Sequence, residues 1–219
     1  MTTSQIRVFL IDDHQLVLDS LRARLSQTPD FELVGSASSA GDALPQLVAT
    51  QPDVVALDVE LPGRGAFDLA LELKTRCPAT KVVFLTGFAS DVLIEQALRV
   101  HAAGYVLKGD SSQTLLEAFR EAAKGNVYFS EQIRDRVRYD AALKRHCLSD
   151  EHPLNGLTPR QIEVLRHLAR GESVKEVARL MHLSQKSVDS HKYRIMNKLG
   201  IHDRVLLARY AIREGLTLP

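Results

Sequence analysis

The chain has 219 residues, which is long enough for two domains. Of these residues 45% are hydrophobic and 25% charged, a composition typical of globular proteins. This composition excludes a disordered, collagenous or coiled-coil protein, and no apolar run approaches the roughly 18 residues that a membrane span needs. The N-terminus lacks a charged-then-apolar signal pattern, and two cysteines, Cys77 and Cys147, are too few for a disulfide scaffold. We therefore expect a cytoplasmic protein with free thiols.

The net charge of +1 hides a division between the two halves of the chain. Residues 1–125 contain 11 Lys and Arg against 16 Asp and Glu, whereas residues 126–219 contain 17 against 11. An acidic first half and a basic second half suggest different partners, and nucleic acid is a candidate for the second.

The first half alternates short apolar runs with longer amphipathic stretches. Strands are predicted at residues 6–11, 31–35, 54–57, 82–85 and 105–107, and helices at 16–27, 40–50, 66–76, 90–100 and 115–123. This alternation predicts an α/β doubly wound fold, with a five-stranded parallel sheet covered on both faces. We place this domain at residues 1–125.

The second half begins with a predicted linker at residues 126–153. Its charged stretch from Ser130 to about His146 has apolar residues at helical spacing, which predicts a linker helix, and residues 147–156 form a loop. Residues 154–219 then carry four helix starts. Thr158 and Ser173 each begin a capping box, while Ser184 and Asp203 cap the third and fourth helices. A small all-helical domain is expected there.

Five polar residues follow the carboxyl ends of the predicted strands: Asp12, Asp13, Asp58, Thr86 and Lys108. In a doubly wound sheet these ends meet in one crevice. Converging carboxylates repel one another unless a hard divalent cation such as Mg²⁺ neutralises them. An aspartate between Mg²⁺ and a lysine is a plausible nucleophile towards phosphorus, because both cations stabilise the charge on the transferred group. Taken singly, each residue could instead be a solvated loop residue or a helix cap.

The first half resembles the receiver domains of two-component response regulators over about residues 5–125. The resemblance rests on the segments Ile11–His14, Leu57–Gly63, Leu85–Gly87 and Gly104–Lys108. It implies that Asp58 accepts a phosphoryl group from a histidine kinase, and that Mg²⁺ lies between Asp12, Asp13, Asp58 and the backbone carbonyl of Glu60.

The same resemblance assigns a switch. Thr86 and Lys108 would bind phosphoryl oxygens, and Tyr105 would be a rotating aromatic residue coupled to Thr86. Gly87 stands where the family mostly has alanine, which we expect to loosen that loop. His14 is best interpreted as a residue at the start of a helix rather than as a metal ligand or phosphoryl carrier.

The lengths of the second and third predicted helices of the C-terminal domain, and the short connection between them, predict a helix-turn-helix. On the third helix Val188, His191, Ile195 and Leu199 form the core stripe, and the opposite face carries varied hydrogen-bonding groups that suit base edges. The basic residues available for phosphates are Lys175, Lys186, Lys192, Arg194 and Lys198. A solvated basic face is the plainer interpretation of this pattern alone.

Residues 157–219 resemble the LuxR-type helix-turn-helix of the NarL/FixJ regulators. The similarity rests on Leu157–Arg160, Glu163–Leu165, Glu176–Ala178, Ser187–His191 and Lys198–Gly200. It implies that Asp189, Ser190 and Tyr193 face the bases, and that Ser187, His191, Lys192 and Lys198 approach the backbone. Many relatives carry lysine at position 189, whereas the carboxylate of Asp189 can only accept, for example from cytosine N4.

These features together predict a phosphorylation-controlled transcription factor that is not an enzyme. Its expected partners are a sensor histidine kinase, promoter DNA and a second copy of the chain on activation, without a membrane. One alternative is a phosphotransferase or phosphatase with Asp58 as nucleophile, but the loops are too short to build a substrate pocket. Another keeps DNA binding and uses the receiver only as a dimerisation module.

Overall fold

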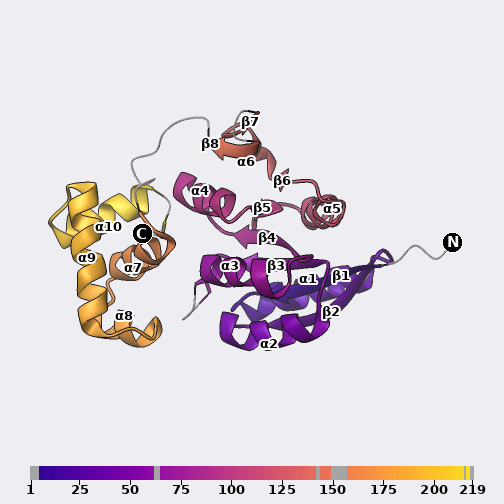
Figure 1. Cartoon of the computed structure of the whole chain (residues 1–219), viewed down its shortest axis with the longest axis horizontal. Coiled ribbons are helices and arrows are strands. Elements are labelled where there is room, and N and C mark those ends of the chain that lie inside the picture. Colours follow the sequence, from indigo (N-terminus) through magenta and orange to yellow (C-terminus); the bar gives the residue numbers. More distant parts are fainter. Residues whose placement is uncertain (1–4, 62–64, 142–143, 149–156, 215, 218–219) are drawn as a thin grey trace. The chain divides into compact units, whose positions relative to one another are not determined.

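A computed structural model describes residues 5–61, 65–141, 144–148, 157–214 and 216–217 (Figure 1). The chain forms two compact units: Met1–Gly87 with Ala97–Asp135, and Phe88–Gln96 with Arg136–Pro219. Within the described residues, no helix is both long and apolar enough to cross a membrane.

The first unit contains a parallel sheet in the order β2-β1-β3-β4-β5-β6. Its strands are β1 (Ile6–Ile11), β2 (Phe31–Ala37), β3 (Val54–Asp58), β4 (Lys81–Thr86), β5 (Gly104–Leu107) and β6 (Tyr128–Phe129). The helices that alternate with the first five strands are α1 (Gln15–Ser26), α2 (Ala40–Thr50), α3 (Ala66–Arg76), α4 (Asp91–Arg99) and α5 (Ser112–Ala123). The doubly wound prediction is confirmed.

The predicted number of strands was too small by one. Tyr128 and Phe129 pair in parallel with Gly104 and Tyr105 and extend the sheet beyond β5. Two residues are too few to show a periodicity that a sequence pattern could detect, and their pairing satisfies backbone groups at the edge of β5.

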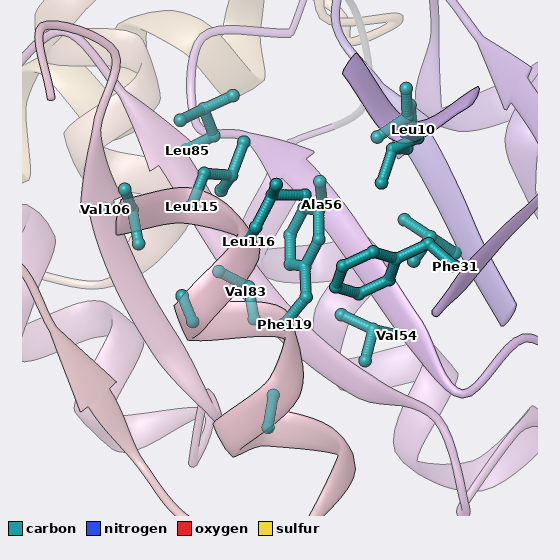
Figure 2. Close-up of a cluster of buried hydrophobic side chains, with 14 of the residues drawn as sticks. Leu10, Phe31, Val54, Ala56, Val83, Leu85, Val106, Leu115, Leu116 and Phe119 are labelled. Atoms are coloured by element: carbon teal, nitrogen blue, oxygen red, sulfur yellow. The ribbon is translucent and has the colours of Figure 1, made fainter. Parts of the chain in front are cut away.

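Successive side chains of a strand point to opposite faces of the sheet, and both faces are covered by helices. On one face Val8 and Leu10 join the buried cluster with helices α1 and α5, and Figure 2 shows Phe119 of α5 pointing toward Phe31. These two rings meet edge to face with centroids 6.1 Å apart. On the other face the ring of Phe84 lies 4.9 Å from that of Phe67 in α3. The strand ends are thereby held between two packed layers.

The linker differs from the prediction. Among the linker residues that the structure describes, only Glu131–Arg134 is helical (α6). Strand β7 (Val137–Asp140) then pairs antiparallel with β8 (Arg145–Leu148). Tyr139 lies opposite His146 with ring centroids 5.2 Å apart, a cross-strand pair that favours a hairpin. The predicted linker helix is therefore wrong, because the backbone groups of Val137–Asp140 pair with those of Arg145–Leu148 and not along one helix. The rest of the predicted loop, residues 149–156, lies outside the described residues.

The last part of the chain forms the four expected helices: α7 (Pro159–Ala169), α8 (Val174–Leu180), α9 (Gln185–Leu199) and α10 (Arg204–Arg213). Both predicted capping boxes are present, Thr158 with Gln161 and Ser173 with Glu176. Ser184 caps α9, and Gly200 ends that helix in the left-handed conformation at φ 66°. Asp203 caps α10.

The two cysteines are free thiols, as predicted. Cys77 ends α3 and is fully buried, where it lies 3.5 Å from the side-chain amide of Gln51. Cys147 lies half-buried in β8. Burial raises the pKa of the Cys77 thiol, with a smaller opposing effect of Gln51.

Candidate functional site

The carboxyl ends of β1, β3 and β5 bring two aspartates and a lysine together. Lys108 Nζ lies 2.9 Å from Asp58 Oδ2 and 2.8 Å from Asp12 Oδ2. The other oxygen of Asp58, Oδ1, accepts from the backbone N–H of Glu60 at 3.0 Å. Asp12 and Asp58 are buried, so these contacts form away from bulk water. The parallel sheet makes this convergence possible, because its strands all end at the same edge and β1, β3, β4 and β5 follow one another across it.

His14 holds the two adjacent carboxylates at the start of α1. Its Nδ1 lies 3.1 Å from Asp12 Oδ1 and 2.8 Å from Asp13 Oδ1, and its backbone N–H donates to Asp12 Oδ1. His14 is also the N-cap residue of α1, as expected of a residue at a helix start. Its contact with both aspartates was not anticipated from the sequence.

Burial sets the electrostatics of this site. Desolvation, helped by the nearby Asp12 carboxylate, raises the pKa of Asp58 to about 6, although Lys108 and the backbone N–H of Glu60 act in the opposite direction. Burial alone would lower the pKa of Lys108, but Asp58 and Asp12 outweigh it and hold that pKa above its usual range. The site therefore contains more negative charge than its single lysine neutralises.

The residues fit a hard divalent cation. Ligand atoms of Asp12, Asp13, His14 and Asp58 lie within 4.8 Å of one another. Asp12 and Asp58 are buried carboxylates that share the single ammonium of Lys108. Buried negative charge that is not fully balanced is unfavourable unless a further cation neutralises it. Oxygen donors of this kind suit Mg²⁺.

Thr86 and Tyr105 lie on the neighbouring strands β4 and β5. Thr86 ends β4 and is fully buried, and its carbonyl accepts from the N–H of Lys108 at 2.7 Å. The ring of Tyr105, in β5, is also fully buried. The structure thus brings the predicted strand-end residues together at one edge of the sheet.

The predicted DNA-reading face of α9 points to solvent. Asp189, Ser190 and Tyr193 are exposed, Tyr193 to 66% of its surface. Among the residues predicted to meet phosphates, Lys175, Arg194 and Lys198 are exposed, and Ser187, His191 and Lys192 are half-buried. Val188 and Ile195 of the predicted core stripe are fully buried.

Four of these residues already have neighbours within the domain. Lys192 Nζ lies 2.6 Å from Asp189 Oδ1, one turn earlier on the same helix. Lys198 Nζ donates to Gln161 at 3.3 Å, and the hydroxyl groups of Ser187 and Ser184 are 2.8 Å apart. Burial, with Arg160 and Arg194 nearby, lowers the pKa of His191, so its imidazole is neutral near pH 7.

Two family models match the chain. Residues 8–120 match the response regulator receiver domain, and residues 155–211 match the bacterial regulatory proteins of the luxR family. The chain is a response regulator with a LuxR-type DNA-binding domain.

Similar proteins extend along nearly the whole of this response regulator. It is 31% identical to the response regulator UvrY of Escherichia coli over 96% of this chain and 95% of that protein. It is also 31% identical to the DNA-binding transcriptional activator DevR/DosR of Mycobacterium tuberculosis, over 98% and 97% of the two chains.

A solved relative has the same fold. RcsB of Salmonella enterica serovar Typhimurium, bound to promoter rprA in the presence of the phosphomimetic BeF3⁻, superposes with a TM-score of 0.70. The two are 25% identical, and the match covers 94% of this chain and 98% of that one. This response regulator is a phosphorylation-controlled DNA-binding transcriptional regulator and not an enzyme.

One contact in the DNA-binding domain was missed from the sequence. Arg160 of α7 donates to the carbonyl of Met181 at 2.6 Å, and to Glu163 at 2.8 Å. Met181 is the C-cap of α8, just before the turn to α9. Arg160 therefore ties α7 to the turn of the helix-turn-helix. A backbone carbonyl 21 positions away leaves no signal in sequence spacing.

Proposed function

We propose that Asp58 is the phosphoacceptor of this regulator. The observation that supports it is the buried position of Asp58, whose carboxylate shares the ammonium of Lys108 with Asp12. One Asp58 oxygen forms the bond to phosphorus as the phosphorus–nitrogen bond of a kinase phosphohistidine breaks. Lys108 and the hydroxyl of Thr86 then hold the phosphoryl oxygens.

Asp12, Asp13, Asp58 and the backbone carbonyl of Glu60 are proposed to hold Mg²⁺. When bound, Mg²⁺ neutralises the carboxylates and stabilises negative charge on the transferred group. Without it, the ammonium of Lys108 is shared between Asp12 and Asp58. A sensor histidine kinase is the proposed donor.

The test of the phosphoacceptor is labelling with a small phosphodonor and Mg²⁺. Asp58→Asn keeps the shape but removes the nucleophilic charge, so acid-labile phosphate should no longer accumulate. Asp19→Asn is the control, because Asp19 is exposed on α1 and pairs only with surface groups among the contacts described. Undiminished labelling of Asp58→Asn would falsify the assignment.

DNA reading is proposed for α9. Asp189, Ser190 and Tyr193 contact bases, and the positioning contacts to phosphates come from Lys175, Ser187, His191, Lys192, Arg194 and Lys198. The exposed position of the first three residues supports this, since base edges can be reached only from an open face. For Lys192 the DNA phosphate must replace Asp189 as partner.

Activation is proposed to produce a homodimer. One helix-turn-helix buries too little surface for tight specific binding, so two half-sites about one helical turn apart are expected. Helix α10 leaves Val205 and Leu206 exposed to 66% and 53%, while Leu207 and Ala211 complete the core. The mass in solution, measured with and without phosphorylation and DNA, tests this. A protein that stays monomeric on its specific site contradicts it.

The same measurements test a receiver that serves only for dimerisation. Such a protein would bind DNA and dimerise equally well as wild type and as Asp58→Asn. A phosphorylation-dependent change that Asp58→Asn abolishes rejects that alternative. We also propose domain boundaries at residues 125 and 154, with the linker between them.

A further inference from the structure

Arg136, immediately before β7, contacts the loop that precedes α4 at two points. Its Nη1 donates to the backbone carbonyl of Ala89, and its Nη2 pairs with the carboxylate of Asp91. Both charged side chains are partly buried. The planar guanidinium offers two donors in a fixed fork, so it fixes two points of the loop at once.

This loop begins directly after Thr86. Thr86 is the last residue of β4, and α4 starts at Asp91, so Ala89 lies three residues beyond the proposed phosphoryl ligand. A shift of Thr86 is therefore transmitted to Ala89 and Asp91 through a very short segment. Gly87 is exposed, and a Cβ there would meet no atom within 4 Å.

The loop also contains a polar group that its present arrangement does not satisfy. Ser90 is buried, and its hydroxyl has no hydrogen-bond partner among the described residues. An unpaired buried hydroxyl is unfavourable. The contact with Arg136 therefore stabilises an arrangement that is not optimal for the loop itself.

The chain just before Arg136 is attached to β5. The backbone N–H of Ser130 donates to the carbonyl of Tyr105 at 3.1 Å, and its hydroxyl accepts from the N–H of Leu107 at 3.0 Å. Ser130 and Ile133 are fully buried. The segment that leads to the hairpin is thus hydrogen-bonded to β5 at Ser130. At its other end, Arg136 contacts the loop after β4.

We infer that Arg136 is a positioning residue that holds the loop after Thr86 in its unphosphorylated arrangement and thereby links the phosphoryl site to the linker hairpin. This rests on the proposed phosphorylation of Asp58. When Thr86 moves to a phosphoryl group, Ala89 and Asp91 move with it, and Arg136 must release them. Removing the contact between Arg136 and the loop should favour the phosphorylated arrangement. A phosphoryl group or its mimic then binds more tightly, because none of its binding free energy is used to break that contact.

The experiment measures the affinity of the full chain for BeF3⁻ with Mg²⁺ by calorimetry. Arg136→Ala should tighten binding by roughly fivefold or more, the lower range of typical coupling between sites. Asp91→Ala should tighten it less, because Arg136 still donates to the carbonyl of Ala89. The double variant should gain no more than Arg136→Ala alone. Arg138→Ala is the matched control, because Arg138 is an exposed arginine of the same hairpin.

A purely structural role would lower the unfolding temperature of Arg136→Ala without tightening BeF3⁻ binding. Arg136→Lys keeps the charge but offers a single point contact, so it should fall between wild type and Arg136→Ala. If Arg136→Ala does not fold, Arg136→Lys and Asp91→Asn carry the same comparison. Unchanged or weaker binding in these variants overturns the inference.

The proposed function fails separately. A wild-type protein that does not bind BeF3⁻, or that binds it equally after Asp58→Asn, overturns the assignment of the phosphoacceptor and the inference together. Wild-type binding that depends on Asp58, with Arg136→Ala equal to Arg138→Ala, overturns only the role of Arg136.

Discussion

The strand-end site and the outer face of α9 both carry charge, but the fold treats them differently. Asp58 and Asp12 are buried and face Lys108, whereas Asp189 and Tyr193 lie open to solvent. Electrostatic interactions are strong in the first environment and largely screened in the second. Substitutions at the strand ends should therefore change the protein itself, while those on α9 should be detected only with DNA.

The largest effect on the protein alone is expected for Asp58→Asn. The pKa of Asp58 is raised to about 6 in the folded chain, above the ordinary value of 3.8, so the folded state binds the proton more tightly than the unfolded state. Wild-type stability therefore falls as the pH rises from about 4 to 6, and the deficit persists above that range. Asparagine carries no such charge.

Without Mg²⁺, Asp58→Asn should raise the free energy of unfolding of the receiver by about 1–3 kcal/mol at pH 7.5, and by much less at pH 4. Urea unfolding in EDTA at both pH values measures this difference. Asp19→Asn serves again as the exposed control. An equal gain at both pH values would show that the charge of Asp58 is not the cause.

Asp13→Ala should weaken Mg²⁺ binding by roughly tenfold or more, because it removes one of three anionic ligands. Calorimetric titration of the protein with MgCl₂ gives the affinity. Asp110→Ala is a suitable comparison, since that carboxylate also lies near the strand ends but accepts from the N–H of Leu107. Equal Mg²⁺ affinity in wild type and Asp13→Ala would move the metal site elsewhere.

On α9, Tyr193→Ala and Asp189→Ala should each cost roughly 1–3 kcal/mol on the best DNA site and much less on random DNA. The pairing of Asp189 with Lys192 sharpens this test, because removing the carboxylate also frees the ammonium. Affinities of both duplexes for Asp189→Ala, with and without Lys192→Ala, separate the two effects. Equal tightening on both duplexes would mean that Asp189 reads no base.

The smallest effect belongs to the phosphate contacts. Lys192→Ala and Lys198→Ala should weaken binding to all sequences alike and reduce the slope of log affinity against log salt by about one. Lys198 also donates to Gln161, so its substitution loosens one contact inside the domain. Titrations at several salt concentrations provide the slopes. A loss confined to the specific site would indicate that the lysine reads sequence.

Much of the fold was predictable because the signals were local. Thr158 and Ser173 mark their helices with capping boxes, and Gly200 marks the end of α9, all within a few residues. Asp12, Asp58 and Lys108 were predictable as a cluster because parallel strands end at one edge of the sheet.

The unpredicted features depend on contacts distant in sequence or on very short elements. The strand β6 and the hairpin β7–β8 have two and four residues per strand, too few to distinguish periods of 2 and 3.6. Arg136 meets Asp91 across 45 positions. Such a pair is decided by tertiary packing, which no local pattern records.

The buried thiol of Cys77 can report on local unfolding of the receiver domain. A thiol reacts as thiolate, and burial both raises the pKa of Cys77 and shields its sulfur from reagents. Alkylation of Cys77 should therefore follow the rare excursions in which the end of α3 detaches, while the half-buried Cys147 in β8 reacts sooner. Because the two thiols react at different rates, mass spectrometry can follow local unfolding at the end of α3 and in the hairpin in the same sample.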